Sequence, residues 1–151
     1  MIACLAFFQA KKKEMLVEMF DTACTINTFM KMFNKILKEQ RFPEVKAGIG
    51  LGSSQELVIM VGKKQVVHDK IWIGDAVVNA SNLSGIANRG SVESICMDKT
   101  TYGRIINSLI KENSDYRKWI KETKLECYPG PFYQCSIVEC DFDEWIKGGM
   151  K

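Results

Sequence analysis

Few residues of this chain have the types and spacing that catalysis requires. The chain has one histidine, His68, so a metal site built from several histidines is not expected. If His68 were the base of a Ser-His-Asp triad, no second histidine would remain as a further base. The acidic pairs Asp69/Asp75 and Asp141/Asp143 lack a recognisable two-metal spacing, and each acid also suits a helix cap or a loop. The residue types alone therefore do not identify a reaction.

The cysteines form no C-x-x-C pair and fall in apolar or strand-like segments. The sequence has six of them: Cys4, Cys24, Cys96, Cys127, Cys135 and Cys140. This pattern predicts buried, reduced thiols and a cytoplasmic location. The apolar opening segment, residues 1–8, has no basic residues before it, which argues against a signal peptide.

Glycines and lysines between residues 48 and 64 give a weak phosphate-binding signal. Gly48, Gly50 and Gly52 alternate along a predicted strand instead of opening a helix, so close backbone approach explains them better than a dinucleotide loop. Lys63 and Lys64 are predicted to lie in a solvated loop, with contact to a nucleotide phosphate as the alternative.

The length and net charge of the chain restrict the classes of protein to which it can belong. A chain of 151 residues makes one domain with a single core. Its net charge of +3 is spread evenly, and no basic helix face carries interleaved aromatic residues, so nucleic acid is not an expected partner. The average apolar and charged fractions argue against a membrane span.

Hydrophobic periodicity predicts alternating strands and helices. The predicted strands are 1–8, 45–51, 57–61, 70–73, 92–97, 125–128 and 132–140, and the predicted helices are 14–39, 75–88, 98–111, 114–121 and a last turn at 141–146. A hairpin is expected between strands 45–51 and 57–61. The order favours an α+β sandwich with one mixed sheet and helices on one face. Because the chain opens on a fully apolar strand, we expect 1–151 to be a single domain that is incomplete at its N-terminus.

The other elements are organised around residues 68–89. A short strand turns at Gly74, Asp75 is predicted to cap the next helix, and that helix is rich in small residues such as Ala76 and Ala80. A helix with so little bulk can lie close against its own sheet or against a second chain. We expect self-association through this helix.

The order of four motifs resembles the catalytic domain of class III nucleotidyl cyclases. The motifs are V-K-A-G-I-G-L-G, E-L-V-I-M-V-G, I-W-I-G-D-A-V-V-N-A-S and S-V-E-S-I-C-M-D-K-T-T-Y, which together span residues 45–102. With the closing segment Y-x-C-x-I-V-E-C-D-F-D-E-W, the chain is most similar to the bacterial pyrimidine nucleotide cyclases of antiphage signalling.

The resemblance implies a ferredoxin-like sandwich that forms a head-to-tail homodimer with nucleotide sites at the interface. It also implies a reaction in which the ribose 3′-hydroxyl of a nucleoside triphosphate, UTP or CTP, attacks the α-phosphorus and releases pyrophosphate. Two divalent ions, Mg²⁺ or Mn²⁺, assist that reaction in the family.

The chain departs from the family at several site positions. Val78 stands where the family has its transition-state asparagine, and Asn82 stands at the arginine. Asn79 is one residue out of place, about 100° around the helix. The base-selecting position falls at Ile71, which cannot hydrogen-bond a purine edge. Arg89 is therefore the candidate that supplies positive charge, with Asn82 as a neutral donor, while Ile71, Val78 and Asn79 are the expected substrate contacts.

The family's metal-binding aspartates would precede residue 1, so this chain is expected to supply no metal ligand. The late lysine of the family would fall near Tyr128, where no lysine stands. Two alternatives follow: a catalytically inactive cyclase-homology domain that dimerises or regulates, and an unrelated ferredoxin-like binding module.

Overall fold

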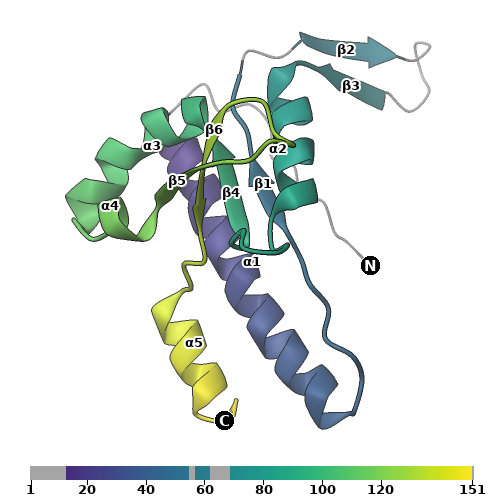
Figure 1. The fold of residues 1–151 in the computed structure, drawn as a ribbon, viewed down its shortest axis with the longest axis vertical. Coiled ribbons are helices and arrows are strands. Elements are labelled where there is room, and N and C mark those ends of the chain that lie inside the picture. Colours follow the sequence, from purple (N-terminus) through teal and green to yellow (C-terminus); the bar gives the residue numbers. More distant parts are fainter. Residues whose placement is uncertain (1–12, 55–56, 62–68, 151) are drawn as a thin grey trace.

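A four-stranded sheet lies between helices in the computed structural model, which describes residues 13–54, 57–61 and 69–150 (Figure 1). The helices are α1 (Lys13–Glu39), α2 (Asp75–Ile86), α3 (Lys99–Glu112), α4 (Tyr116–Trp119) and α5 (Cys140–Lys147). The strands are β1 (Ile49–Leu51), β2 (Leu57–Val61), β3 (Asp69–Ile73), β4 (Ile95–Asp98), β5 (Lys121–Lys124) and β6 (Pro131–Cys135). The predicted α+β class is confirmed.

The sheet has the strand order β1-β4-β6-β5 and is mixed. β1 runs parallel to β4, with Gly50 opposite Cys96, whereas β6 is antiparallel to both β4 and β5. The carboxyl ends of β1 and β4 therefore lie at the same edge of the sheet.

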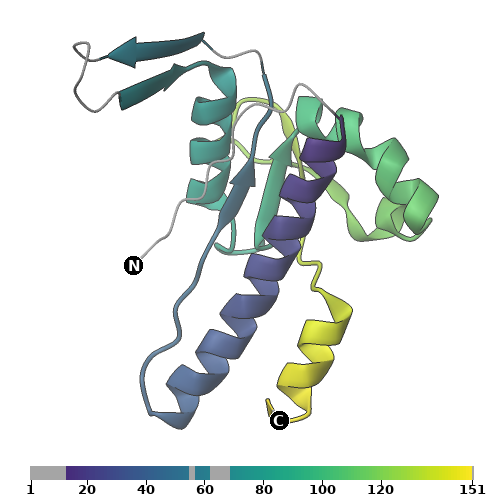
Figure 2. The ribbon, with the colours of Figure 1, turned by 180° about the vertical axis from the view of Figure 1, so that it is seen from behind.

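Helices cover both faces of this sheet, so the expectation that they share one face is wrong. Ile49 and Leu51 of β1 are buried in one core with Phe20 of α1 and Ile105 of α3. Gly50, between them, faces the backbone of α2. Because neighbouring residues of a strand point to opposite faces, α1 and α3 must lie on one side and α2 on the other. The views in Figures 1 and 2 agree with this arrangement.

The hairpin is built differently from the prediction. β2 pairs with β3 in antiparallel register, with Ile59 opposite Ile71, and does not pair with β1. The two strands form a separate sheet that projects from the top of the domain in Figure 1. The prediction paired the wrong strands because the apolar segment 57–61 fits a hairpin pattern equally well with the strand before it and with the strand after it.

Several element boundaries also differ from the sequence-based expectations. β5 covers Lys121–Lys124 and not 125–128, because cross-strand pairing with β6 places a strand on polar residues that periodicity does not mark. Gly74, not Asp75, is the N-cap residue of α2, and Glu139, not Asp141, caps α5. The long helix and the Asp98 cap of α3 are confirmed. The predicted strand at residues 1–8 lies outside the described residues.

The far half of α1 extends beyond the sheet and is held by α5. Lys31 of α1 and Lys147 of α5 both pair with the buried Asp143, at N–O distances of 3.2 and 2.7 Å.

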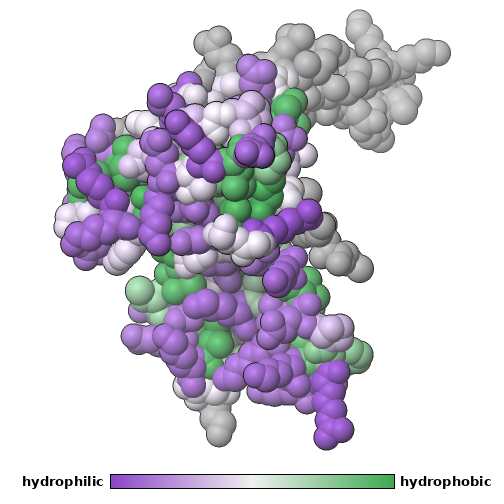
Figure 3. Space-filling view, viewed as in Figure 1, coloured by the Kyte–Doolittle hydropathy of each residue, from purple (hydrophilic) through white to green (hydrophobic). Residues whose placement is uncertain are grey.

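Hydrophilic residues cover most of the face shown in Figure 3, with apolar residues visible between them. Among the described helices, none is both long and apolar enough to cross a membrane.

Candidate active site on helix α2

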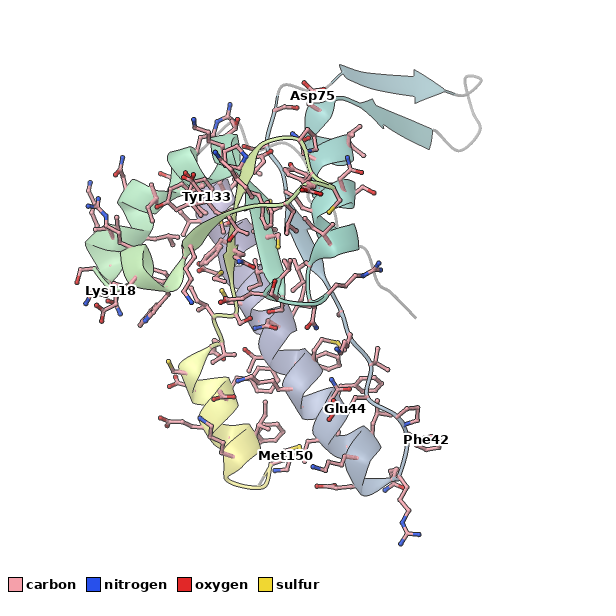
Figure 4. The ribbon with its side chains drawn as sticks, in the orientation of Figure 1. Phe42, Glu44, Asp75, Lys118, Tyr133 and Met150 are labelled. Carbon is pink, nitrogen blue, oxygen red and sulfur yellow. The ribbon has the colours of Figure 1, made fainter. Side chains whose placement is uncertain are left out.

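The sheet edge at the carboxyl ends of β1 and β4 is the candidate site. In open sheets, ligands bind beyond the carboxyl ends of parallel strands. Ser53 follows β1 at this edge, Asp98 ends β4, and α2 begins beside them. Figure 4 shows Asp75 in the first turn of α2, next to the projecting hairpin.

A buried polar cluster ties these elements together. The carboxylate of Asp98, a residue only 6% exposed, accepts hydrogen bonds from the Thr101 backbone N–H at 2.6 Å and from Asn79 Nδ2 at 3.4 Å. The Thr101 hydroxyl donates to Ser53 Oγ at 3.0 Å. The backbone N–H of Ala76, in the first turn of α2, donates to Ser54 Oγ at 3.0 Å. These bonds fix the start of α2 relative to the ends of both strands.

Val78 and Asn82 form an outward stripe on α2. They are four residues apart and therefore lie on the same face of the helix. Val78 is 57% exposed and Asn82 is also exposed, whereas Ala76, Ala80 and Leu83 are buried against the sheet. Asn79 points elsewhere, toward Asp98. The structure thus places two of the expected site residues where a ligand or a second chain can reach them.

The other three expected site residues are not brought together with this stripe in one chain. Arg89 is exposed and follows the end of α2, whereas Asn79 lies in its second turn near the opposite end of the sheet. The backbone of Ile71 lies in β3, directly opposite Ile59. Arg89 therefore cannot act on the same group as Asn79 without a second copy of the chain or a change in structure.

Asp98, Thr101 and Ser53 were not among the expected site residues. The sequence did mark Asp98, as the cap of α3, but that pattern alone does not place it beside Asn79. Only the parallel pairing of β1 with β4 does so, and parallel neighbours far apart in the chain leave no local signal.

Two carboxylates, those of Asp75 and Asp98, belong to elements that meet at the candidate site. No three histidine, cysteine, aspartate or glutamate side chains among the described residues lie close enough to hold a metal ion. Asp98 accepts hydrogen bonds from Thr101 and Asn79, and Asp75 is exposed in the first turn of α2.

Three of the predicted buried cysteines are confirmed. Burial raises the pKa of the Cys24 thiol, and it raises the pKa of Cys96 and of Cys135 to about 12. These thiols stay protonated at neutral pH and are unreactive as nucleophiles. Cys127 and Cys140 differ from the expectation because both are exposed.

Comparison with curated proteins finds two relatives. Over 144 residues, which are 95% of the chain, the sequence is 38% identical to a uridylate cyclase of Treponema porcinum, and the match covers 48% of that protein. Over 90 residues it is 31% identical to a uridylate cyclase of Gulbenkiania mobilis, covering 57% of this chain and 35% of the relative. No protein-family profile and no solved structure matches. The chain spans about half the length of the first relative. It is similar to bacterial pyrimidine cyclases, over 95% of its own length for the first relative and over 57% for the second.

Proposed function

We propose that this chain is part of a nucleotidyl cyclase that converts UTP into 3′,5′-cyclic UMP and pyrophosphate. The observation that carries the proposal is the 38% identity to a uridylate cyclase over 95% of the chain. In the reaction the ribose 3′-oxygen loses its proton and bonds to the α-phosphorus, while the bond from that phosphorus to the β-phosphate oxygen breaks. The resemblance to antiphage cyclases extends the proposal to a second-messenger role for the product.

The α2 stripe is the part of the active site that this chain contributes. Asn82 is exposed and carries an amide that can donate a hydrogen bond to a phosphate oxygen as charge develops on it. Val78, one turn earlier, presents an apolar surface and no hydrogen-bond donor. Arg89 is the exposed cation that follows the same helix, and we assign it the charge that Asn82 lacks.

A homodimer would bring these separated groups together. β2 is entirely apolar in sequence, and β3 has three apolar residues after Asp69 and Lys70. The two strands form a ribbon that pairs only with itself among the described strands. An isolated two-stranded hairpin is marginally stable in water, so a covering partner is expected. A second copy of the chain would cover the ribbon and place its own α2 near the first.

The metal ions implied by the resemblance, Mg²⁺ or Mn²⁺, remain part of the proposal. When bound they would offset charge on the triphosphate. Because the family's metal-binding aspartates would precede residue 1, residues 1–151 alone are expected to form little or no cyclic nucleotide.

The test is an assay of the protein encoded by the complete reading frame with UTP, CTP, ATP and GTP in separate reactions. Each reaction contains Mg²⁺ or Mn²⁺, and products are separated by chromatography. We expect cyclic UMP as the main product, and residues 1–151 serve as the matched low-activity control. A preference for ATP or GTP would refute the pyrimidine assignment, and robust turnover by residues 1–151 would refute the placement of the metal ligands.

A further inference from the structure

A cavity of about 440 Å³ lies at the end of the sheet opposite the candidate active site. It is bounded by Glu93 before β4, by Lys118 and Trp119 of α4, and by residues 136–138 after β6. β5 begins only at Lys121, which pairs with Gln134, so none of the described strands lies on the β5 side of the chain beyond Cys135. The end of α4 forms the facing wall, and a cavity remains between them.

The apolar part of this cavity is held in place by contacts with the core. Trp119 is 44% exposed, and its ring meets Tyr116 edge to face at a centroid distance of 5.4 Å. Tyr116 in turn meets the buried Phe20 at 6.1 Å. On the other wall, the carbonyl of Ile137 accepts a hydrogen bond from Asn27 Nδ2 at 2.9 Å. The shape is therefore formed before any ligand arrives, as in most small-molecule sites.

The rim of the cavity presents two ammonium groups, each beside one carboxylate. The lining residues include the ammonium groups of Lys118 and Lys121 and one carboxylate, that of Glu93. Lys118 contacts Asp115 at 2.8 Å and Lys121 contacts Glu93 at 3.6 Å, and the lysine side chains are 80% and 65% exposed. Because an ammonium group has three donors, each lysine can still bind an anion. Figure 4 shows Lys118 on α4, far from Asp75.

We propose that this cavity is a second binding site, for a flat aromatic molecule that carries a single negative charge. The ring packs between Trp119 and Val138, and the anionic group lies at the rim between Lys118 and Lys121. A volume of 440 Å³ falls within the range of small-molecule pockets, roughly 300–1,000 Å³. A cyclic mononucleotide and an aromatic carboxylate share this chemistry. The site is separate from α2 and does not depend on the proposed cyclase activity.

Two exposed cysteines provide a matched test in the unmodified chain. Cys140 lines the cavity, whereas Cys127 is exposed elsewhere. Residues 1–151 are alkylated with iodoacetamide, with or without 3′,5′-cyclic UMP in one arm and indole-3-carboxylate in the other, and each cysteine is followed by mass spectrometry. At a ligand concentration ten times its Kd, alkylation of Cys140 should slow about tenfold. The rate at Cys127 should not change.

Protection of Cys140 in only one arm identifies that ligand class and supports the site. Lys121→Ala should weaken the protection about two- to fivefold, the usual effect of losing an exposed charge contact. Lys124→Ala, an exposed lysine on the same strand outside the cavity, should leave it unchanged. Val138→Trp should fill the cavity and abolish protection, with circular dichroism confirming that the variant is folded. The proposal is overturned if neither ligand protects Cys140, if Cys127 is protected equally, or if protection survives Lys121→Ala or Val138→Trp unchanged.

Discussion

Gly50 of β1 lies directly against the backbone carbonyl of Ala80 in α2, so that a methyl group at Gly50 would overlap that oxygen. Gly48 and Gly52 meet the carbonyls of Ala87 and Ala76 in the same way. Three glycines in alternate positions therefore let a helix of small residues lie on the strand backbone. This close approach sets the position of the α2 stripe.

Gly50→Ala should destabilise the domain. The added methyl group meets main-chain atoms, which cannot rotate away, and overpacking of this kind costs about 1–3 kcal/mol. Urea denaturation followed by circular dichroism measures the loss. Gly85→Ala is the matched control, because nothing lies within 4 Å of a Cβ at that position. It should stabilise the helix by about 0.5–1 kcal/mol. Equal effects at the two glycines would contradict the close packing of β1 and α2.

The contacts of Asp143 predict a loss of stability in acid. The hydrogen bond from Lys147 holds the pKa of Asp143 below its ordinary value of 3.8, burial opposes this shift, and the bond from Lys31 adds to it. The native state therefore favours the ionised carboxyl. Its contribution is fully present above the unfolded-state pKa and is lost as pH falls through the lower native pKa.

Asp143→Asn should therefore lower the urea midpoint at pH 7 and flatten its decline between pH 5 and about pH 2. Thermal or urea unfolding at a series of pH values measures this. The control is Asp115→Asn, since Asp115 forms an exposed ion pair with Lys118 that contributes little. If the urea midpoint of both variants declines with falling pH as steeply as that of the parent, then the charge of Asp143 does not hold α5 to α1.

How much of this molecule can be predicted from its sequence depends on whether the signal is local. The long helix and the cap at Asp98 were predicted because periodicity and capping act within a few residues. The polar β5 and the partner of β2 were not, because cross-strand pairing between distant residues decides them. The alternating glycines were correctly attributed to close backbone approach. The sequence left open whether the small-residue helix lay against its own sheet or against a second chain.

The candidate site shows the same division. Val78 and Asn82 were placed on one helix, and their shared face follows from the helical repeat. Asn79 makes a contact that the sequence does not predict, because its side chain donates to the buried Asp98. That contact joins residues from α2 and β4, whose proximity no local pattern encodes.

Self-association should depend on the exposed side of α2. The sheet occupies the small-residue side, and Ala80 is fully buried there, so Ala80→Arg would disrupt the core instead of testing an interface. Val78→Arg is the suitable change, because Val78 is 57% exposed. Light scattering at micromolar concentration should show a shift toward monomer. Asn107→Arg, at an exposed position on α3, should leave the size unchanged. A monomeric parent chain would contradict the proposed dimer.

Tyr133 should titrate at unusually high pH. Its hydroxyl donates to Glu122 at 2.7 Å across the β5–β6 pair, and this bond raises the pKa of Tyr133 to about 12. The bond therefore stabilises the fold below the ordinary tyrosine pKa of 10.0, and its contribution is lost as pH rises toward 12. In Glu122→Gln, ultraviolet titration should show one tyrosine ionising earlier than in the parent. Glu126→Gln, an exposed change outside the strands, should leave the titration as it is.

Arg89 and Asn82 should affect turnover differently from Asn79 in the protein encoded by the complete reading frame. Asn82 and Arg89 are exposed and make no contact that the core needs, so their loss should leave the unfolding midpoint unchanged. If they donate to a phosphate as charge develops, Asn82→Ala and Arg89→Ala should each lower kcat about 10²-fold or more. Arg104→Ala, an exposed arginine on α3, is the matched control for charge.

Asn79→Ala removes a bond to Asp98, so it should lower the unfolding midpoint. Cyclic UMP formation and urea unfolding, measured on the same preparations, separate the two kinds of effect. Full activity in Arg89→Ala would remove that residue from the mechanism, and a fall in stability matching the fall in kcat would assign Asn82 a structural role instead.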